Sequence, residues 1–465
     1  MYAKVNSEVI EFLRSLFGKD RVLLDPDILE VYAHDETAGL HAQPEVVVRA
    51  TTAEQISRLM KFANEKKIPI TPRGAGYGLS GGAVPVCGGI VLSLEKMDKI
   101  LEIDKKNLML TVEPGVITGK IHEAVEKEGL FYPPDPASLD SCSIGGNIAE
   151  NAGGPRAVKY GVTKDYVCGL DAVLPSGEII QLGGKLVKNV TGYNLIDLLI
   201  GSEGTLAIIT RIILRLIPLP KVTIDLFVAF NEFQAAADTV SAIIEHQILP
   251  ASIEFMEQDS LLTCEKYLKK ELPLREAAAF LLIKLDGNDK GEVEALCESV
   301  GEVCFEQGAI DVLVADDRIT QDRLWEARRA IIEALKDRSP VNQMEDIVVP
   351  RAKINDFLRE MKKLQKRYEY PIICFGHSGD GNVHVNILKE NRPQEKWEKI
   401  IPELSKEIFD IALTFGGQIT GEHGVGATRR KYLKKAVGSK TLTLFRGIKE
   451  LFDPNNILNP GKIFP

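Results

Sequence analysis

Two glycine-rich stretches in the second half of the chain carry side chains that could bind a metal ion. They are Phe375-Gly-His-Ser-Gly-Asp-Gly-Asn-Val-His-Val-Asn-Ile387 and Thr420-Gly-Glu-His-Gly-Val-Gly426. His377, His384 and Glu422 would form an open three-ligand site for a divalent ion such as zinc, iron or manganese. A single histidine is more often a hydrogen-bonded structural residue, but three of the seven histidines fall in these two stretches. We therefore expect a metal site here.

The first of these stretches is expected to form two strands joined by a turn. Residues 379–381 are Gly-Asp-Gly, and polar and apolar residues alternate after them. Because side chains alternate between the two faces of a strand, His384 and Asn386 share one face, and the turn can bring His377 back toward them. In the second stretch glycines expose Glu422 and His423 in a loop.

A glycine-rich stretch nearer the N-terminus, from Pro72 to Pro85, has five glycines between Gly74 and Gly82. We call it the first glycine loop. Successive backbone N–H groups in such a loop form a concavity that binds anions, so a phosphate or pyrophosphate is the expected ligand. The loop contains a formal G-x-G-x-x-G pattern, but a strand is expected after it where a Rossmann site needs a helix. A flexible surface loop is the alternative.

The residues before the first glycine loop predict a β-α-β unit. Residues 45–50 are expected to form a strand, Thr52 to Gln55 is a capping box that begins a helix, and residues 68–70 form a strand that leads into the loop. A second glycine-rich region, residues 132–154, looks too broken for regular structure. A third, residues 188–206, precedes another strand, and the whole pattern is α+β.

Together these three glycine-rich regions resemble the FAD-binding domain of the vanillyl-alcohol oxidase / p-cresol methylhydroxylase flavoprotein superfamily. The resemblance covers about residues 40 to 220, and the histidine motifs extend it to the branch of the glycolate oxidase subunit and D-lactate or D-2-hydroxyglutarate dehydrogenases. It implies an α+β fold with a two-subdomain FAD-binding domain of the PCMH type and an α+β cap domain with an antiparallel sheet. The implied limits are 1–218 for the FAD domain, 219–405 for the substrate cap, and 406–465 for a segment that returns to the FAD domain.

The resemblance implies FAD as the cofactor. Some members bond the flavin to a histidine in the first glycine loop, and the loop has none here, so noncovalent FAD is expected. The implied flavin-contacting residues are Arg73, Gly74, Ala75, Gly76, Tyr77, Gly78, Leu79 and Ser80 in the first loop, Pro134, Asp135, Ser138, Gly145, Gly146 and Gly153 in the second region, Glu203, Gly204 and Ile208 around the third, and Asn459 near the C-terminus.

The resemblance also implies roles around the substrate. It makes His377, His384 and Glu422 the metal ligands and places His423 beside the substrate hydroxyl. Arg328, three residues after a tryptophan on an amphipathic helix, corresponds to the arginine that binds the substrate carboxylate, although a helix arginine is otherwise more often a solvated charge. Asn386 is included in the catalytic set. The lysine that the family uses for the substrate maps near Met344, so that contact is missing or supplied otherwise.

These observations predict an FAD-dependent 2-hydroxy acid dehydrogenase. The metal and Arg328 would hold the carboxylate and hydroxyl of the substrate, His423 would remove the hydroxyl proton, and hydride would pass to flavin N5. D-Lactate is the first choice, with glycolate and D-2-hydroxyglutarate as alternatives, because the absent lysine argues against a second carboxylate. Two other classes are a flavin-free metal hydrolase and a noncatalytic flavoprotein subunit that relays electrons.

Composition limits the partners and the location. The 465 residues carry a formal net charge of −9, which argues against nucleic acid or an anionic membrane surface as the main partner. No targeting or transmembrane segment is expected, and seven scattered cysteines without a C-x-x-C pair favour a reducing cytoplasm. The same lack of cluster ligands predicts that electrons leave to a separate acceptor. The family resemblance implies an electron-transferring flavoprotein or an iron–sulfur subunit as this acceptor.

Overall fold

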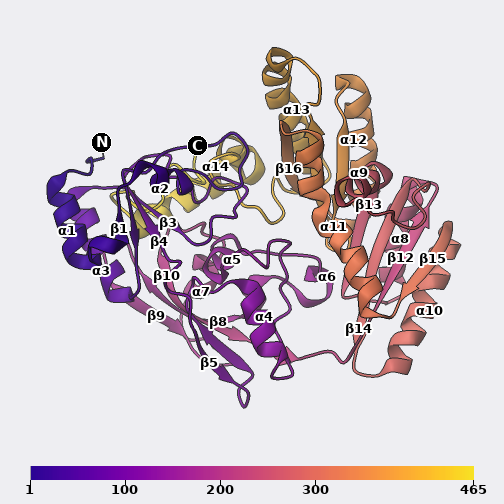
Figure 1. Cartoon of the computed structure of the whole chain (residues 1–465), viewed down its shortest axis with the longest axis horizontal. Coiled ribbons are helices and arrows are strands. Elements are labelled where there is room, and N and C mark those ends of the chain that lie inside the picture. The colour runs from indigo at the N-terminus through magenta and orange to yellow at the C-terminus, as the bar shows by residue number, and fades with distance from the viewer. Residues whose placement is uncertain (1) are drawn as a thin grey trace. The chain divides into compact units, whose positions relative to one another are not determined.

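The structure is a computed structural model that describes residues 2–465, and its chain forms two compact units (Figure 1). Unit 1 comprises Met1–Gly153, Val162–Leu219 and His423–Pro465, and unit 2 comprises Gly154–Gly161 and Pro220–Glu422. The sequence analysis placed domain limits after residues 218 and 405. In the structure the long segments of the two units divide after Leu219 and after Glu422. The function assigned to each domain stays a prediction. Among the described residues, every helix is too short or too polar to cross a membrane.

Unit 1 begins with the predicted β-α-β unit. Strands β2 (Val46–Arg49) and β3 (Ile70–Arg73) both pair in parallel with β4 (Ile90–Ser93), and α3 (Ala53–Lys66) connects β2 to β3. The hydroxyl of Thr52 caps α3 by accepting the backbone N–H of Gln55 at 3.3 Å. Strand β1 (Val22–Leu23) completes this sheet in the order β1-β2-β4-β3.

The second sheet of unit 1 is antiparallel and lies over a separate hydrophobic core. Its order is β5 (Ile100–Asp104), β6 (Met109–Val112), β10 (Ile208–Arg215), β8 (Val167–Val173), β9 (Ile179–Gly183). A short pair joins β7 (Leu130–Phe131) to β11 (Ile217–Pro218). The remaining helices of unit 1 before its C-terminal segment are α1 (Ser7–Phe17), α2 (Pro26–Val31), α4 (Thr118–Glu126), α5 (Ile144–Glu150) and α7 (Leu195–Leu199).

Helix α5 corrects one sequence expectation. Residues 132–154 looked too broken for regular structure, yet Ile144–Glu150 is helical and ends where Asn151 adopts the left-handed conformation, with φ of 52°. Glycine is needed at Gly145 because a Cβ there would lie 2.9 Å from the carbonyl oxygen of Pro114. The glycines of this region therefore allow a helix to pack against a neighbouring backbone.

The C-terminal segment is fastened into unit 1 by a buried lysine. Lys449 lies on α14 (Arg430–Phe452), and its Nζ donates to the carbonyl oxygens of Thr205 at 2.8 Å and Leu458 at 2.9 Å. The backbone N–H of Ile70 in β3 donates to Ile457, a residue almost 400 positions later in the chain. The last residues of the chain thus complete the edge of the first sheet.

Unit 2 is built on one seven-stranded antiparallel sheet with the order β15-β12-β14-β13-β17-β18-β16 (Figure 1). Its strands are β12 (Val222–Phe230), β13 (Ser252–Glu257), β14 (Ala279–Gly287), β15 (Ala309–Ala315), β16 (Asn342–Val348), β17 (Ile372–Gly376) and β18 (Asn382–Leu388). The cap predicted from the sequence has this antiparallel architecture, and the α+β fold class is confirmed.

Helices cover both faces of this sheet. One face packs against α8 (Phe233–Glu245), α10 (Lys290–Glu306), α12 (Ile354–Tyr368) and α13 (Gln394–Thr414). The other packs against α9 (Gln258–Leu268) and α11 (Arg318–Arg338), and the short α6 (Ala157–Tyr160) also contacts β13. Helix α9 was not expected from the sequence. It pairs with α11, which carries Arg328.

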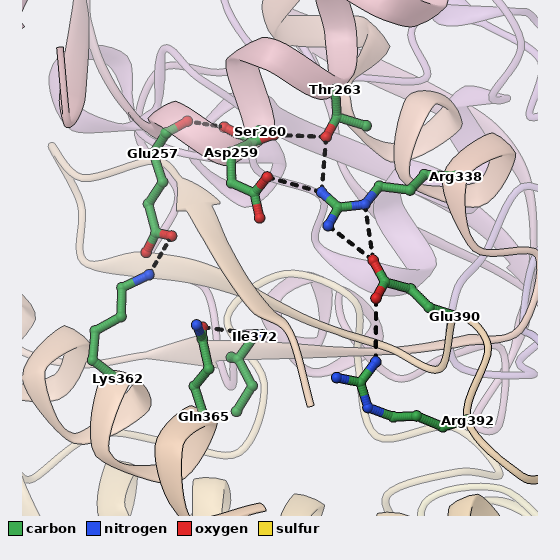
Figure 2. Close-up of polar contacts among 10 residues, drawn as sticks. All are labelled: Glu257, Asp259, Ser260, Thr263, Arg338, Lys362, Gln365, Ile372, Glu390 and Arg392. Carbon is green, nitrogen blue, oxygen red and sulfur yellow. Dashed lines mark hydrogen bonds and ion pairs between the residues drawn. The ribbon is translucent and has the colours of Figure 1, made fainter. Parts of the chain in front are cut away.

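A polar network holds the end of α11 in place (Figure 2). Arg338, the last residue of α11, donates to Glu390 from Nε at 3.1 Å and from Nη2 at 2.9 Å, and to Asp259 from Nη1 at 2.9 Å. The hydroxyl of Thr263 also accepts from Nη1 at 3.1 Å. Because Asp259 and Thr263 lie on α9, one guanidinium joins both helices of this face to the segment after β18.

Two carboxyl groups in unit 1, those of Glu203 and Glu150, have unequal surroundings. Glu203 accepts the backbone N–H groups of Val425 at 2.7 Å and Gly426 at 2.6 Å. Glu150 has a buried Oε2 that accepts no hydrogen bond. Burial, together with the charge of Glu203, raises the pKa of Glu150 well above its ordinary value of 4.5. Glu150 is therefore the group of this pair that keeps its proton.

This difference predicts a pH-dependent stability. Above pH 4.5 the unfolded chain releases the Glu150 proton while the folded chain retains it, so the free energy of unfolding falls as the pH rises toward the folded pKa. Glu150→Gln removes this loss. We expect it to be more stable than wild type at pH 8 by on the order of 1 kcal/mol, with a smaller difference near pH 5.

Urea unfolding of the purified protein between pH 5 and 8 measures the difference. The exposed Glu11→Gln on α1 serves as the control, with a pH profile parallel to that of wild type. A constant difference between Glu150→Gln and wild type at every pH would contradict the assignment.

Candidate functional site

The predicted strand-turn-strand carries both histidines of the proposed metal site. Strands β17 and β18 pair with Phe375 opposite His384, and His377 follows β17 in the turn. The rings of His377 and His384 lie 5.4 Å apart and nearly perpendicular, at 86°. Gly381 has φ of 94°, and a Cβ there would lie 2.1 Å from the carbonyl oxygen of Val349. Glycine is therefore required for the turn that brings the two imidazoles together.

Glu422 joins the two histidines within unit 2. Its Oε1 lies 3.4 Å from Nε2 of His377 and 3.5 Å from Nε2 of His384, and one ligand atom from each residue lies within 4.8 Å of the others. Both histidines are 3% exposed, so their polar nitrogens are shielded from water. Two neutral nitrogens and one carboxylate oxygen that converge in this way fit a divalent ion with an open coordination position.

A buried aspartate that the sequence did not single out positions Glu422. Asp346 lies on β16 directly opposite His384. Its Oδ2 accepts the backbone N–H groups of Gly421 at 2.8 Å and Glu422 at 2.9 Å, and the hydroxyl of Thr420 at 2.7 Å. One carboxylate thereby fixes the loop that carries the third predicted ligand.

A second buried carboxylate, Glu254 on β13, joins a predicted metal ligand to the predicted substrate arginine. Its Oε1 lies 2.8 Å from Nδ1 of His377, and its Oε2 lies 2.5 Å from Nη2 of Arg328. The Glu254 side chain is fully buried, and Arg328 is 5% exposed with its guanidinium over the ring of Phe375. Nε of Arg328 is buried and donates no hydrogen bond, so the arginine keeps a donor for an incoming carboxylate.

The charge balance of this region favours a cation. Burial disfavours a charged imidazole, but the charges of Glu254 and Glu422 and the hydrogen bonds to them raise the pKa of His377 well above its ordinary value of 6.5. Burial also raises the pKa of Asp380, in the same turn, to about 7, although the charge of His377 opposes the shift. The surrounding carboxylates therefore stabilise positive charge at the point where the proposed ligands converge.

Asn386 and Met344 lie on the same face of the sheet as the histidines. Asn386 is two residues after His384 on β18, and Met344 is its partner on β16. The side-chain Nδ2 of Asn386 is buried and donates no hydrogen bond. Met344, near which the family's substrate lysine maps, thus lies beside the predicted catalytic asparagine, and its side chain is apolar.

The first glycine loop fits a phosphate-bearing ligand. Among the described residues, the backbone N–H groups of residues 76–80 donate no hydrogen bond to the protein. Two of its glycines have no room for a side chain, because a Cβ on Gly74 would lie 2.2 Å from Oγ of Ser143 and one on Gly76 would lie 2.2 Å from Nη2 of Arg73. The Ser80 hydroxyl is buried and makes no hydrogen bond. A row of unused backbone donors in a glycine-rich loop matches the pyrophosphate of FAD.

The glycine-rich regions meet within unit 1, as the resemblance implied. Ser143, at the start of the second region's helix, accepts the N–H of Ala75 at 3.3 Å. Gly204 lies against Pro72, since a Cβ on it would be 2.9 Å from Cγ of that proline. The side-chain amide of Asn459 donates to the carbonyl oxygens of Gly82 at 3.0 Å and Glu203 at 2.8 Å.

Several predicted flavin residues use their polar atoms on the protein itself. The carboxylate of Glu203 and the amide nitrogen of Asn459 bind backbone groups, Arg73 donates to the carbonyl oxygen of His34 at 2.8 Å, and Ile208 is 1% exposed in a hydrophobic core. The other predicted flavin residues of the second region lie at three places. Pro134, Asp135 and Ser138 follow β7, Gly145 and Gly146 lie on α5, and Gly153 ends the first segment of unit 1. Their contact with a flavin stays a prediction.

His423 is the residue directly after Glu422, and it is the first residue of the last segment of unit 1. The next residues of that segment are held by Glu203 and by Ser80, whose carbonyl oxygen accepts the N–H of Ala427 at 2.8 Å. The predicted base is therefore fixed on the flavin-domain side by the loop that follows it. The sequence analysis missed this role of Glu203, for which the signal in the sequence was a carboxylate between glycines in residues 201–204.

Comparison with known proteins finds family models that match both the first and the second half of the chain. A model of the FAD-binding domain matches residues 44–183, and a model of the C-terminal domain of FAD-linked oxidases matches residues 219–463. A D-lactate dehydrogenase of Anaerostipes hadrus is 42% identical over 468 residues, which cover 99% of this chain and 98% of the relative. The glycolate oxidase subunit GlcD of Bacillus subtilis is 43% identical over 434 residues, which cover 93% and 92%.

The fold has solved counterparts. The structure of p-cresol methylhydroxylase with substrate bound superimposes with a TM-score of 0.81 at 19% identity and covers 100% of this chain and 98% of that one. The FAD-binding domain argues against the flavin-free hydrolase considered above. The matches to both domain models, and relatives of more than 40% identity across nearly the whole chain, establish that this protein belongs to the FAD-linked oxidase family of flavoprotein oxidoreductases.

Proposed function

We propose that the protein is an FAD-linked dehydrogenase that oxidises a small 2-hydroxy acid, with D-lactate as the first choice, to the 2-oxo acid. The observation that supports this proposal is the site of unit 2. There His377, His384 and Glu422 converge on one point, while Arg328 and Asn386 keep buried donors without a partner. A 2-hydroxy acid offers a carboxylate and a hydroxyl to such a set of groups.

Each residue of the proposed site has a separate role in the reaction. Arg328 binds the substrate carboxylate through its remaining N–H donors, and Asn386 orients the substrate by a hydrogen bond. His423 takes the proton from the substrate hydroxyl as the C2–H bond breaks. FAD supplies the acceptor for the hydride, and a divalent ion held by the His377, His384 and Glu422 set supplies a Lewis acid. We propose zinc, iron or manganese for this ion.

The apolar neighbour of Asn386 supports a substrate with a single carboxylate. Met344 stands on the sheet face of the proposed site. A second carboxylate there would lose water without gaining a cation, which is unfavourable. This favours D-lactate over D-2-hydroxyglutarate, and glycolate is the other alternative. The names of the similar proteins, a D-lactate dehydrogenase and a glycolate oxidase subunit, agree with this substrate class.

Electrons leave the flavin to a separate acceptor in this proposal. Seven free cysteines, four of them buried in unit 2, offer no cluster-binding pattern in residues 2–465. An electron-transferring flavoprotein or an iron–sulfur subunit is the proposed acceptor, and a cytoplasmic location is proposed with it. Direct and rapid reduction of NAD by the purified chain would contradict this part of the proposal.

Anaerobic mixing of the yellow protein with separate hydroxy acids tests the proposed reaction. We expect D-lactate to bleach the flavin absorbance within seconds, and L-lactate to leave it unchanged at the same concentration. Glycolate and D-2-hydroxyglutarate complete the panel and rank the alternatives. A flavin that no 2-hydroxy acid bleaches would instead support a noncatalytic electron-relay subunit.

Removal of one metal ligand should separate the two cofactors. His384→Ala is expected to keep near-stoichiometric FAD, because the glycine loops lie in unit 1, and to lose metal, because two ligands make a poor site. Turnover should fall by about 100-fold or more. Elemental analysis and flavin absorbance on one sample measure both contents, and a fully active, metal-free, yellow variant would show that the histidines are structural.

Met344→Lys tests the substrate preference. A lysine on the site face supplies the cation that a second carboxylate needs, so the ratio of kcat/KM for D-2-hydroxyglutarate to that for D-lactate should rise about tenfold or more. Gln343→Lys is the matched control, because the neighbouring residue of a strand points to the opposite face. Equal ratios in the two variants would remove Met344 from the site.

A further inference from the structure

Glu254 occupies an unusual position between two groups with different proposed tasks. Its two oxygens contact different residues: Oε1 contacts the metal ligand His377 at 2.8 Å, and Oε2 contacts Arg328 at 2.5 Å. The side chain is fully buried, so water does not compete for either oxygen. A carboxylate with one oxygen on each side transmits a change at one group to the other.

The contact with His377 determines which ring nitrogen carries a proton. A carboxylate oxygen can only accept, so Nδ1 of His377 is the donor in this pair. Nε2 is then the ring nitrogen that faces Glu422, at 3.4 Å. Such a carboxylate–histidine pair fixes the ring orientation and strengthens the imidazole as a ligand.

The contact with Arg328 determines how the guanidinium is presented. Arg328 has no other polar contact among the described residues, and Phe375 supports its flat face with the guanidinium carbon 5.0 Å from the ring centre. Without Glu254 the buried charge would lose its counter-ion, which is costly. Glu254 therefore forms an ion pair with Nη2, and Nε stays a buried donor without a hydrogen bond.

We propose that Glu254 is a positioning residue that links metal binding at His377 to carboxylate binding at Arg328. The inference rests on the proposed function, because it takes His377 as a metal ligand and Arg328 as the substrate arginine. It predicts that the metal affinity of the protein depends on Arg328, which is not a ligand, and that this dependence passes through Glu254.

The chain supplies a matched control on the same strand. Glu257 is also a buried glutamate of β13, and its Oε2 pairs with Nζ of Lys362 on α12 at 2.6 Å (Figure 2). It lies three positions after Glu254, an odd offset along a strand, so its side chain points to the opposite face of the sheet. Glu257→Gln removes a buried charge from β13 and leaves the site face unchanged.

Mn²⁺ titration of the flavin-loaded protein, freed of divalent ions by chelation, measures the link. Free Mn²⁺ is counted by electron paramagnetic resonance, and a thermal unfolding curve of each variant verifies that it is folded. We expect Glu254→Gln to weaken Mn²⁺ binding by about 10- to 100-fold and to raise the KM for D-lactate, whereas Glu257→Gln stays within about threefold of wild type.

A second variant tests the link from the other end. Arg328→Met should change the Mn²⁺ affinity at least about threefold in the protein with Glu254 and have no further effect in the Glu254→Gln background. Simple removal of a nearby positive charge would act equally in both backgrounds. This equal effect, or an unchanged affinity in Glu254→Gln, would overturn the inference. If Glu254→Gln does not fold, an unchanged Mn²⁺ affinity in Arg328→Met overturns it alone.

His384→Ala distinguishes failure of the inference from failure of the proposed function. Mn²⁺ binding that His384→Ala abolishes, together with a Glu254→Gln protein of wild-type affinity, overturns the link and leaves the proposed function standing. If wild-type protein binds no Mn²⁺, or binds it with an affinity that His384→Ala leaves unchanged, the proposed metal site is contradicted. The inference that depends on this site is then contradicted as well. Bleaching by D-lactate is scored separately in either case.

Discussion

Buried charge needs an opposite charge or a hydrogen bond, and this constraint organises the site face of unit 2. Glu254 and Asp346 are fully buried carboxylates on one sheet, where an unpaired charge would cost several kcal/mol. Each is satisfied by a different kind of partner. Glu254 is balanced by Arg328 and by the imidazole of His377. Asp346 accepts three hydrogen bonds from residues 420–422 and a fourth from the side-chain amide of Asn382. The geometry of the proposed metal ligands follows from these two pairings.

The sequence predicted the parts of this site that depend on local patterns. Alternation of polar and apolar residues placed His384 and Asn386 on one face, and the Gly-Asp-Gly turn returned His377 to the same side. Neither Glu254 nor Asp346 could be found in this way, because their roles depend on which strands are neighbours. Strand β13 lies beside β17, and β16 lies beside β18, although each pair is distant in the chain or separated by a helix. Strand order is a nonlocal property that a single sequence does not encode in its periodicity.

The flavin domain shows a similar division. Residue types predicted a loop whose N–H groups bind an anion, and the structure has a row of such donors without a protein partner. Glycine content alone misled the interpretation of residues 143–154, because α5 uses its glycines for close packing against Pro114. Glu203 and Asn459 were predicted to contact the flavin, and the structure shows which backbone groups their side chains bind.

The order of segments in the two units has a consequence for synthesis on the ribosome. Unit 2 is an insertion: most of it, Pro220–Glu422, is contiguous, while unit 1 waits for His423–Pro465. The emerging chain can therefore complete the inserted unit while the edge of the first sheet, which Ile457 and Leu458 close beside Ile70, is still uncovered. The peptide bond between Glu422 and His423 is the last junction between the units. The proposed metal ligand Glu422 therefore belongs to the unit that can fold first. The proposed base His423 belongs to the segment that completes unit 1 afterwards.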